Sequence, residues 1–373
     1  MFNKDKVAIH GSYYGDNFGD TLFVVLFVKW LKKYGLESDD IVLPFASERV
    51  RRLVSVSKVK GIRSLLMSKV LVLIGGGYLG EPNSNVKKWS ARLFYKHLSI
   101  ILIAYITKKP YIFIGVGAGP ISVSIVRRIV VKMCNNSEMI IVRDLESKEY
   151  LIEYGVKESK IVCSVDSILS LENENDEDFK TGLISNLEFI KENDTTYIGI
   201  HLPVFNYYSE KLANIGCELK NYCSSIGKYK VIVFNDFYKE NYDYKVRNII
   251  LENIDQENVI DVKYENTDKM LNLLANLDIL VTSKLHCGLV ANCFNKYVIS
   301  ISEHNKTERL YKQLGIKGRS IKVGNYRDGE LLSLLMSYDN SNQKLIVTKQ
   351  IKERAQKNQK YLFDFLDKNY KKI

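Results

Sequence analysis

Along the first half of the chain, short apolar runs alternate with longer stretches that mix polar and apolar residues. A short apolar run bounded by polar or glycine residues indicates a buried strand, and the stretches between such runs have the spacing of amphipathic helices. This alternation favours βαβ units around a parallel sheet. The predicted strands are Val7–His10, Ile41–Leu43, Val70–Ile74, Tyr111–Ile114, Met139–Val142 and Ile161–Cys163.

Three helices are predicted between these strands. Thr21–Tyr34 follows Asp20, which occupies the position expected of an N-cap, and precedes Gly35, which is typical of a helix end. A long helix, Lys87–Thr107, and a short one, Ser147–Tyr154, come later. We expect each of them to cover a face of the parallel sheet.

A run of acidic residues from Leu171 to Lys180 interrupts this pattern and predicts an exposed linker. The alternation then resumes, and a helix is predicted near His304–Leu314. A last helix over Thr348–Lys368 has apolar positions at helical spacing. The further predicted strands are Tyr197–Ile200, Val231–Phe234, Val259–Val262, Ile279–Val281 and Tyr297–Ile299.

The whole pattern predicts an α/β protein with two Rossmann-like domains, whose parallel sheets face a cleft. Residues 1–170 would form the N-terminal domain and residues 195–325 the C-terminal domain. Residues 326–373 would form C-terminal helices that pack on the body.

Composition places the chain among globular proteins, since 46% of its 373 residues are hydrophobic and 26% are charged. The polar start of the chain predicts no signal peptide. The longest apolar stretch, Leu98–Ile106, is far shorter than the roughly 20 residues that cross a bilayer. Six cysteines without CxxC spacing suggest reduced thiols and no zinc site. We therefore expect a cytoplasmic protein, with peripheral contact at the inner face of the membrane as an alternative.

The net charge of +11 is concentrated towards the C-terminus, where residues 343–373 hold nine Lys or Arg against three acidic residues. No helix-turn-helix, RNP or zinc-finger signature accompanies this charge, so a nucleic-acid partner is not expected. A basic surface facing anionic lipid or a phosphorylated substrate fits equally well.

Glycine-rich segments follow three of the predicted strands in the first half. Gly75–Gly80 has the spacing GxGxxG, but Pro82 follows it, and no acidic residue ends a strand about 20 positions later, which argues against a dinucleotide site. Gly115–Gly119 and the loop Gly11–Asp20 are the other two segments. Glycine lets backbone N–H groups approach an anion, and tight turns without a ligand are the alternative.

The strongest candidate for chemistry follows the predicted strand Ile279–Val281. Ser283, Lys284 and His286 place a hydroxyl, a cation and an imidazole beyond its carboxyl end, where ligands bind in open α/β sheets. The small residues of Cys287–Ala291 predict a helix start packed closely on the sheet. His286 in this setting is a candidate proton donor near neutral pH.

Two further strand ends carry chemistry-bearing residues. Arg143 and Asp144 follow a strand and form either a local ion pair or a site at which the guanidinium binds carboxylate or phosphate. His201 also ends a predicted strand. Neither HxH nor HExxH spacing occurs, so we expect no metal site.

Taken in order, these segments resemble the polysaccharide pyruvyl transferase family. The resemblance covers about Val7 to Leu314. It rests on Gly11–Asp20, Gly75–Gly77, Gly115–Pro120, Arg143–Ser147, Asp166, Ser283–His286 and Ile299–Lys306.

The resemblance implies a two-domain fold like that of GT-B glycosyltransferases. It also implies transfer of a pyruvyl group from phosphoenolpyruvate to a sugar of a bacterial surface polysaccharide intermediate, which forms a cyclic pyruvate ketal. The partners would be phosphoenolpyruvate, as co-substrate, and a glycan acceptor, of which a lipid-linked form is one alternative. No cofactor and no metal are implied.

The resemblance also assigns roles to residues. His286 would be the general acid, on the C-terminal, donor-side domain. The donor would be held by Lys284, Arg143, Ser283 and Lys306. The acceptor or its phosphate would be held by loops of the N-terminal domain that contain Asn17, Gly19, Asp20, Gly75, Gly76, Gly77, Gly117 and Gly119.

One position departs from the family pattern, which usually has arginine where this chain has Lys284. Lysine keeps the charge but lacks the bidentate fork of arginine. Two alternatives therefore stay open. One is a GT-B-type glycosyltransferase that uses a sugar nucleotide, and the other is a non-catalytic, glycan-binding relative.

Overall fold

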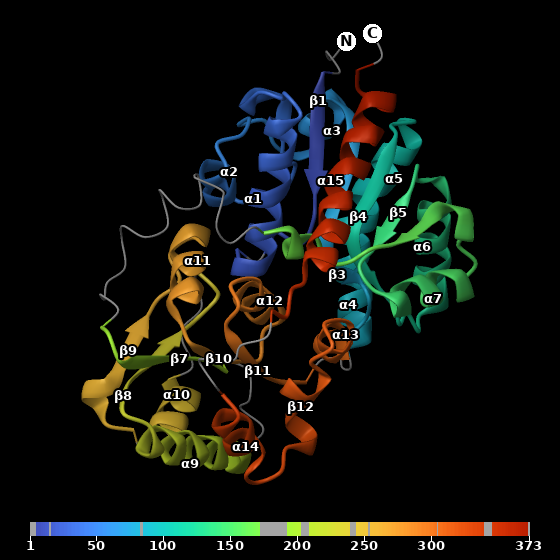
Figure 1. The fold of residues 1–373 in the computed structure, drawn as a ribbon. Coiled ribbons are helices and arrows are strands. Elements are labelled where there is room, and N and C mark those ends of the chain that lie inside the picture. The colour runs from blue at the N-terminus through green and yellow to red at the C-terminus, as the bar shows by residue number, and fades with distance from the viewer. Residues whose placement is uncertain are drawn as a thin grey trace. The chain divides into compact units, whose positions relative to one another are not determined.

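The computed structural model describes residues 5–14, 16–82, 85–171, 192–202, 209–238, 244–252, 254–303, 305–338 and 345–371. The chain divides into two compact units (Figure 1). Unit 1 contains residues 1–170 and 349–373, and unit 2 contains residues 171–348. The acidic run predicted as a linker lies outside the described residues, apart from Leu171.

Unit 1 is built on a six-stranded parallel sheet in the order β2-β1-β3-β4-β5-β6. Its strands are β1 (Lys6–His10), β2 (Ile41–Val42), β3 (Ser68–Leu79), β4 (Tyr111–Ala118), β5 (Ile140–Val142) and β6 (Ile161–Cys163). Its helices are α1 (Phe18–Lys33), α2 (Glu48–Leu53), α3 (Gly61–Met67), α4 (Val86–Leu93), α5 (Ser99–Ile106), α6 (Ser124–Asn136), α7 (Leu145–Glu153) and α15 (Lys349–Asn369).

The strands of this sheet are apolar at nearly every position, which is typical of strands that are buried on both sides. Helices accordingly cover both faces of the sheet. On one face, α3 to α7 share a core with alternate residues of the strands. On the other face, α1 contacts β3 and α15 contacts β4 (Figure 1). The predicted amphipathic last helix is confirmed, since α15 buries Ala355, Leu362, Phe365 and Leu366. It returns the chain to unit 1 after unit 2 is complete.

Two local predictions in unit 1 were wrong. The N-cap of α1 is Asn17 and not Asp20, because the Asn17 side chain accepts a hydrogen bond from the Asp20 N–H. Gly75–Gly77 and Gly115–Gly117 lie inside β3 and β4, so they do not form loops after the strands. The long helix predicted over Lys87–Thr107 is confirmed, and it contains a π-helical segment, Phe94–Leu98, between α4 and α5.

Unit 2 is built on a second six-stranded parallel sheet, in the order β12-β11-β10-β7-β8-β9. Its strands are β7 (Thr195–His201), β8 (Lys228–Phe234), β9 (Val259–Val262), β10 (Ile279–Thr282), β11 (Tyr297–Ser302) and β12 (Ser320–Lys322). Its helices are α9 (Ser209–Ser225), α10 (Tyr244–Leu251), α11 (Thr267–Asn276), α12 (Leu285–Cys293), α13 (Asn305–Gln313) and α14 (Glu330–Met336).

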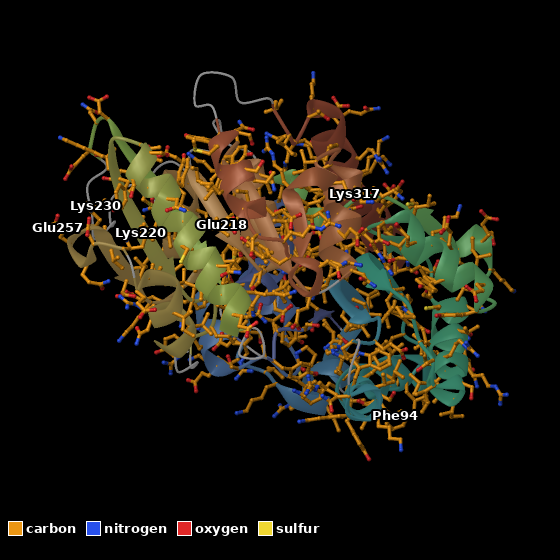
Figure 2. All side chains as sticks on the ribbon, turned by 90° about the horizontal axis from the view of Figure 1, so that it is seen from below. Phe94, Glu218, Lys220, Lys230, Glu257 and Lys317 are labelled. Atoms are coloured by element: carbon orange, nitrogen blue, oxygen red, sulfur yellow. The ribbon has the colours of Figure 1, made fainter. Side chains whose placement is uncertain are left out.

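A buried carboxylate joins two helices of unit 2. Glu218, labelled on α9 in Figure 2, accepts hydrogen bonds from the N–H groups of Gly329 and Leu332, both at 2.8 Å. A carboxylate at a helix N-terminus satisfies N–H groups that have no partner within the helix. This contact holds α14 in unit 2, whereas α15 belongs to unit 1.

Both sheets reverse their strand order at one point. The second sheet has the order of the Rossmann fold and reverses between β7 and β10, whereas the first reverses between β1 and β3. In open α/β sheets, ligands bind at such a reversal, outside the carboxyl ends of the strands. We call these places the first and the second carboxyl edge. Among the described residues, no helix is long and apolar enough to span a bilayer.

Candidate active site

The second carboxyl edge gathers polar side chains from three strands. His201 is the last residue of β7, and Asp236 follows β8 by two residues. Ser283 and Lys284 follow β10, and His286 lies in the first turn of α12. Ser283 and Asp236 are buried, whereas Lys284 and His286 are half-buried. This edge therefore combines two buried polar side chains with a cation and an imidazole that stay partly accessible.

Strand pairing fixes the position of His201 in this group. Thr282 pairs with His201 across β10 and β7, and the Ser283 N–H donates to the His201 carbonyl at 2.9 Å. The hydroxyl of Thr282 lies 3.2 Å from Nδ1 of His201 and accepts from the Lys284 N–H at 3.1 Å. The His201 ring also stacks on Phe234 of β8, with centroids 4.7 Å apart. The imidazole thus has little freedom to turn.

Asp236 lies close to both His201 and Lys284. One oxygen, Oδ1, lies 3.3 Å from Nε2 of His201 and 3.4 Å from the ammonium of Lys284. Burial would raise the pKa of this carboxyl, but the interactions with His201 and Lys284 outweigh burial and lower the pKa to about 2. An ionised carboxylate only accepts hydrogen bonds, so Asp236 faces the His201 ring and the Lys284 ammonium as an acceptor.

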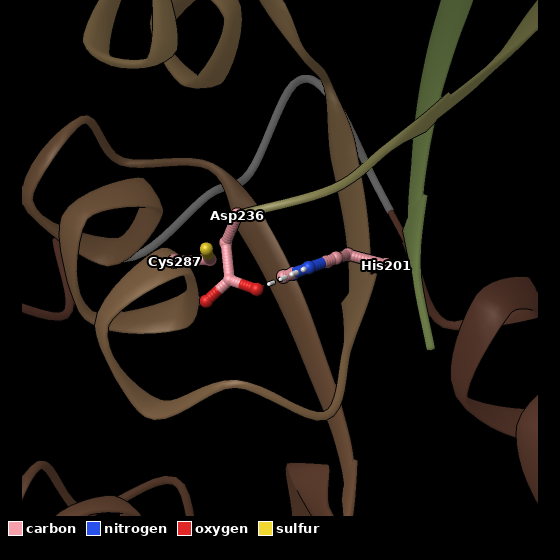
Figure 3. A group of neighbouring side chains, drawn as sticks. All are labelled: His201, Asp236 and Cys287. Atoms are coloured by element: carbon pink, nitrogen blue, oxygen red, sulfur yellow. Dashed lines mark ion pairs between the residues drawn. The ribbon is translucent and has the colours of Figure 1, made fainter. Parts of the chain in front are cut away.

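His201, Asp236 and Cys287 also form the one group that offers metal-ligand atoms close together in the described part of the chain, all within 4.8 Å (Figure 3). Two features disfavour a cation there. Burial and the charge of Asp236 raise the pKa of the Cys287 thiol well above its usual range, which opposes the thiolate form that binds metals. Lys284 already supplies a positive charge to the same carboxylate oxygen. The group therefore resembles an internal ion pair more than a metal centre.

A close approach of α12 to the sheet supports this geometry. A Cβ at Gly288 would lie 2.9 Å from the hydroxyl of Tyr311 and 3.4 Å from Cγ2 of Thr282. Only glycine leaves room for the helix at this depth, as the small-residue pattern predicted. The helix in turn fixes where its first turn places His286.

Lys306, the remaining predicted donor ligand of unit 2, lies in the first turn of α13, which follows β11. Since β11 neighbours β10, Lys306 belongs to the same edge of the second sheet. His304 lies outside the described residues.

At the first carboxyl edge, glycines make room for an arginine. The guanidinium of Arg143 lies so close to β4 that a Cβ at Gly117 would be 2.9 Å from its Nε, and one at Gly77 would be 3.5 Å from Nη2. Arg143 is buried and contacts Asp166 at 3.0 Å and Asp144 at 3.8 Å. The local ion pair considered for Arg143 and Asp144 is thus made at shorter distance with Asp166.

The other predicted glycines of unit 1 serve close packing in different ways. A Cβ at Gly75 would lie 2.2 Å from the ring of Phe23 in α1, so glycine is needed there for α1 to reach the sheet. A Cβ at Gly76 would lie 3.5 Å from the Ser12 hydroxyl, at the loop that follows β1. Gly119 has a φ of 66°, and its Cβ would overlap Tyr150.

The N-terminus of α1 holds the remaining predicted residues. Asn17 caps the helix, its Nδ2 donates to Asp20 at 2.5 Å, and Gly19 is buried in the first turn. This loop follows β1, which adjoins the point at which the first sheet reverses its order. The structure thus places Asn17, Gly19 and Asp20 at the first carboxyl edge, and Lys284 and His286 at the second.

Sequence reasoning missed the role of Asp236 and the connection of His201 to Lys284. Both residues carried a weak signal, since His201 ends a predicted strand and Asp236 follows another by two residues. Their proximity depends on the strand order, which places β7 between β8 and β10. Nothing in the spacing of the sequence indicates that order.

Solved structures of proteins in complex with UDP or a UDP-sugar have a similar fold. Those of Staphylococcus aureus MnaA with UDP and of the Neisseria meningitidis UDP-GlcNAc 2-epimerase with UDP-GlcNAc both give a TM-score of 0.65, at 11% and 13% identity. The match covers 98% of this chain in both cases, and 97% and 100% of theirs. Anabaena HepE with UDP and glucose gives 0.60 at 11% identity, covering 98% of this chain and 100% of its own. At such identities the likeness shows the fold, which is GT-B-like.

No curated protein matches the sequence significantly. The profile of the polysaccharide pyruvyl transferases, by contrast, matches residues 17–305. This range contains Asn17, the glycines of β3 and β4, Arg143, and the group around Asp236 with Lys284 and His286. The resemblance first seen in separate segments thus extends over most of the chain, and the chain belongs to the polysaccharide pyruvyl transferase family.

Proposed function

We propose that this protein transfers the pyruvyl group of phosphoenolpyruvate to two hydroxyls of one sugar in a surface-polysaccharide intermediate. The observation that carries the proposal is the pairing of Lys284 with buried Asp236, two residues before His286, at the second carboxyl edge. A cation held at a known position and a nearby imidazole are the groups that the donor chemistry requires.

In the proposed reaction, His286 gives a proton to the methylene carbon of phosphoenolpyruvate, and the double-bond electrons form the new C–H bond. The adjacent carbon becomes oxocarbenium-like and is attacked by one sugar hydroxyl, which loses its proton. The second hydroxyl then attacks the same carbon, while the C–O bond to phosphate breaks and phosphate leaves with the electron pair. The second hydroxyl proton is released, and one of the two protons restores His286.

Lys284 would bind the carboxylate or phosphate of the donor. Its ammonium has three N–H donors, and the contact with Asp236 uses one direction, which leaves others for an anion. Ser283 and Lys306 would add a hydroxyl and a second cation at the same edge. Asp236, held by His201, would act as a positioning residue for Lys284.

The first carboxyl edge would bind the acceptor. Asn17, Gly19 and Asp20 lie at the N-terminus of α1, and Gly76 borders the loop after β1. Backbone N–H groups at such a place favour the hydroxyls or phosphates of a glycan intermediate. Arg143, predicted from the sequence as a donor ligand, is buried beneath Gly77 and Gly117 and paired with Asp166, so it would support this edge without contacting the acceptor. The scheme needs no redox cofactor and no metal.

The test is phosphate release from phosphoenolpyruvate with a panel of sugar acceptors, with product masses read by mass spectrometry. His286→Gln keeps a polar side chain of similar reach but cannot supply the proton, so turnover should fall about 10²–10⁴-fold. Lys269→Ala, on an exposed part of α11, is the matched control and should keep full activity. Near-normal turnover of His286→Gln would refute the acid role.

A second candidate function is glycosyl transfer from a sugar nucleotide. The observation in its favour is the similarity to structures that hold UDP or UDP-sugars. Release of UDP from a UDP-sugar, with no phosphate release from phosphoenolpyruvate, would favour this candidate. Binding of a glycan without turnover of either donor would indicate a non-catalytic relative instead.

A further inference from the structure

One long stretch of unit 1 contains no acidic residue. From Pro82 to Ser137 the sequence has nine Lys or Arg and not a single Asp or Glu. This stretch forms α4, the π-helical segment, α5, β4 and α6. Lys109 is buried, and the other eight cations lie on or beside the helices: Lys87, Lys88, Arg92, Lys96, Lys108, Arg127, Arg128 and Lys132. Within the described part of the chain, none of these eight makes an ion pair.

The same helices expose large apolar side chains. Tyr95 is 75% exposed, Ile106 67% and Leu102 38%. These three positions are seven and four residues apart, so they lie on one side of the helix. Phe94, in the π-helical segment, is also exposed and points away from the ribbon (Figure 2). Exposed apolar residues in such a row need an explanation that scattered ones do not.

The neighbouring helix α6 extends this surface. It packs beside α5, and the ammonium of Lys132 lies 5.4 Å above the ring of Tyr105. Ile125 is 58% exposed near the start of α6, and Arg128 is exposed one turn later. We call the exposed residues of α4, the π-helical segment, α5 and α6 the α4–α6 face. It combines unpaired cations with aromatic and aliphatic side chains.

The basic C-terminal segment, which the sequence made the first candidate for lipid contact, differs from this face. Lys360 contacts Asp364 at 2.8 Å, and Lys368 contacts Glu138 at 2.7 Å. Lys371 lies 3.5 Å from Asp367. These three cations are therefore paired with carboxylates, and α15 buries Ala355, Leu362, Phe365 and Leu366 in unit 1. Charge and exposed apolar surface coincide at the α4–α6 face instead.

We infer that the α4–α6 face docks on the surface of an anionic lipid bilayer. Lysines and arginines near such a surface each add attraction to the anionic headgroups, and Tyr, Phe, Leu and Ile side chains enter the boundary with the acyl chains. The aliphatic side chains favour a bilayer over a nucleic acid, which offers no apolar layer to receive them. The inference does not depend on the proposed reaction, because it concerns binding in the absence of substrate.

Co-sedimentation of the full chain with vesicles tests the inference. Vesicles of phosphatidylcholine with phosphatidylglycerol should bind the protein, those of phosphatidylcholine alone should bind it weakly, and salt should weaken binding to the first kind. Lys88→Ala with Arg92→Ala and Arg128→Ala should weaken binding at least about tenfold. Tyr95→Ser with Leu102→Ser and Ile106→Ser should also reduce binding, with an unchanged circular dichroism spectrum as the check of folding.

Matched controls carry the same changes elsewhere. Lys357→Ala with Lys360→Ala and Lys368→Ala on α15, and Met336→Ser with Leu345→Ser in unit 2, should leave vesicle binding unchanged. A second readout is tryptophan quenching by lipids with brominated acyl chains. In a Trp30→Phe variant the remaining signal comes from Trp89 on α4, and it should be quenched.

Three results would overturn the inference. The first is binding that the α15 variants abolish and the α4–α6 variants retain. The second is equal binding to both kinds of vesicle. The third is self-association that the serine variant removes in light scattering while vesicle binding is absent, which would make the face an interface between two copies of the chain.

Discussion

Each carboxyl edge contains a buried carboxylate paired with a cation, but the two pairs differ in access. At the first edge, the side chains of Arg143 and Asp166 are only 8% and 3% exposed. At the second, Asp236 is 7% exposed but Lys284 is 28% exposed. The first pair is thus enclosed beneath the glycines of β4, while the second leaves its cation within reach of a ligand. A buried carboxylate can thus pair with a cation that is enclosed in one place and with a cation that stays accessible in another.

The pKa values of the two carboxyls are also shifted in opposite directions. Burial raises the pKa of Asp166, and Arg143 only partly offsets that effect. Burial acts on Asp236 as well, but there His201 and Lys284 overcome it and the pKa falls to about 2. Two partners, His201 and Lys284, therefore bring the pKa of a buried carboxyl below its usual value, whereas Arg143 does not. Four experiments can test whether the two edges have different roles.

The largest difference should come from removing each carboxylate. Asp166→Ala removes the close partner of an enclosed guanidinium and should lower the free energy of unfolding by about 3–5 kcal/mol. Asp236→Ala should cost about 1–3 kcal/mol, because the Lys284 side chain can turn towards water. Urea unfolding measures both, with Glu257→Ala, an exposed site, as control. Equal losses would mean that the two pairs do the same structural work.

The second prediction concerns the accessible cation and rests on the proposed donor. Lys284→Ala should reduce kcat/KM for phosphoenolpyruvate by roughly 10²–10³-fold, because the charge that meets the donor anion is lost. Lys284→Arg should retain or improve donor binding, since arginine adds a bidentate fork. Steady-state kinetics with varied donor concentration checks both variants. A larger loss in Lys284→Arg than in Lys284→Ala would show that lysine serves a different ligand.

The third prediction uses the opposite pKa directions. The folded-state pKa of Asp236 lies below its unfolded value, so this group stabilises the fold above about pH 4 and loses about 2 kcal/mol as pH falls towards 2. The pKa of Asp166 is raised instead, so its contribution weakens as pH rises above about 4.

Urea midpoints measured across acidic pH separate the two carboxylates. Asp236→Asn should make the rise of stability with pH shallower, whereas Asp166→Asn should make it steeper. Slopes that change in the same direction in both variants would contradict the assignment of opposite shifts.

The smallest effect should come from Gly117→Ala. The new methyl would lie 2.9 Å from Nε of Arg143, so the guanidinium must shift within its enclosure. We expect a loss of about 1 kcal/mol in unfolding free energy, because the end of an arginine side chain can yield by a few tenths of an ångström. Gly324→Ala, which has open space around its Cβ, is the control. A loss as small as that of the control would show that Gly117 is not needed for the arginine.

Much of the fold could be predicted because apolar runs such as Val70–Ile74 and Val231–Phe234 are long enough to identify buried strands. The strand β12 was missed, since Ser320-Ile321-Lys322 has one apolar residue. The glycines of β3 and β4 were placed in loops because glycine usually ends a strand, and only the three-dimensional structure shows the side chains that need their space.

Whether a residue of the candidate site could be predicted depended on its distance along the chain from the other site residues. Ser283, Lys284 and His286 could be grouped because they are neighbours in the sequence. His201 and Asp236 could not be joined to them, because the strand order that brings β7 and β8 beside β10 follows from packing of the whole unit. Residues contributed by one segment are visible in a sequence, whereas those assembled across a sheet are not.

The position of α15 has a consequence for biosynthesis. Ala355, Leu362 and Leu366 are fully buried in unit 1, which otherwise consists of the first 170 residues. A ribosome makes the chain from the N-terminus, at about 5–20 residues per second. All of unit 2 therefore emerges before α15, which packs beside β4 on one face of the first sheet. We expect the domain that is translated first to be the last to complete its core. Until α15 packs, part of one face of its sheet stays exposed, and we expect chaperones to bind it.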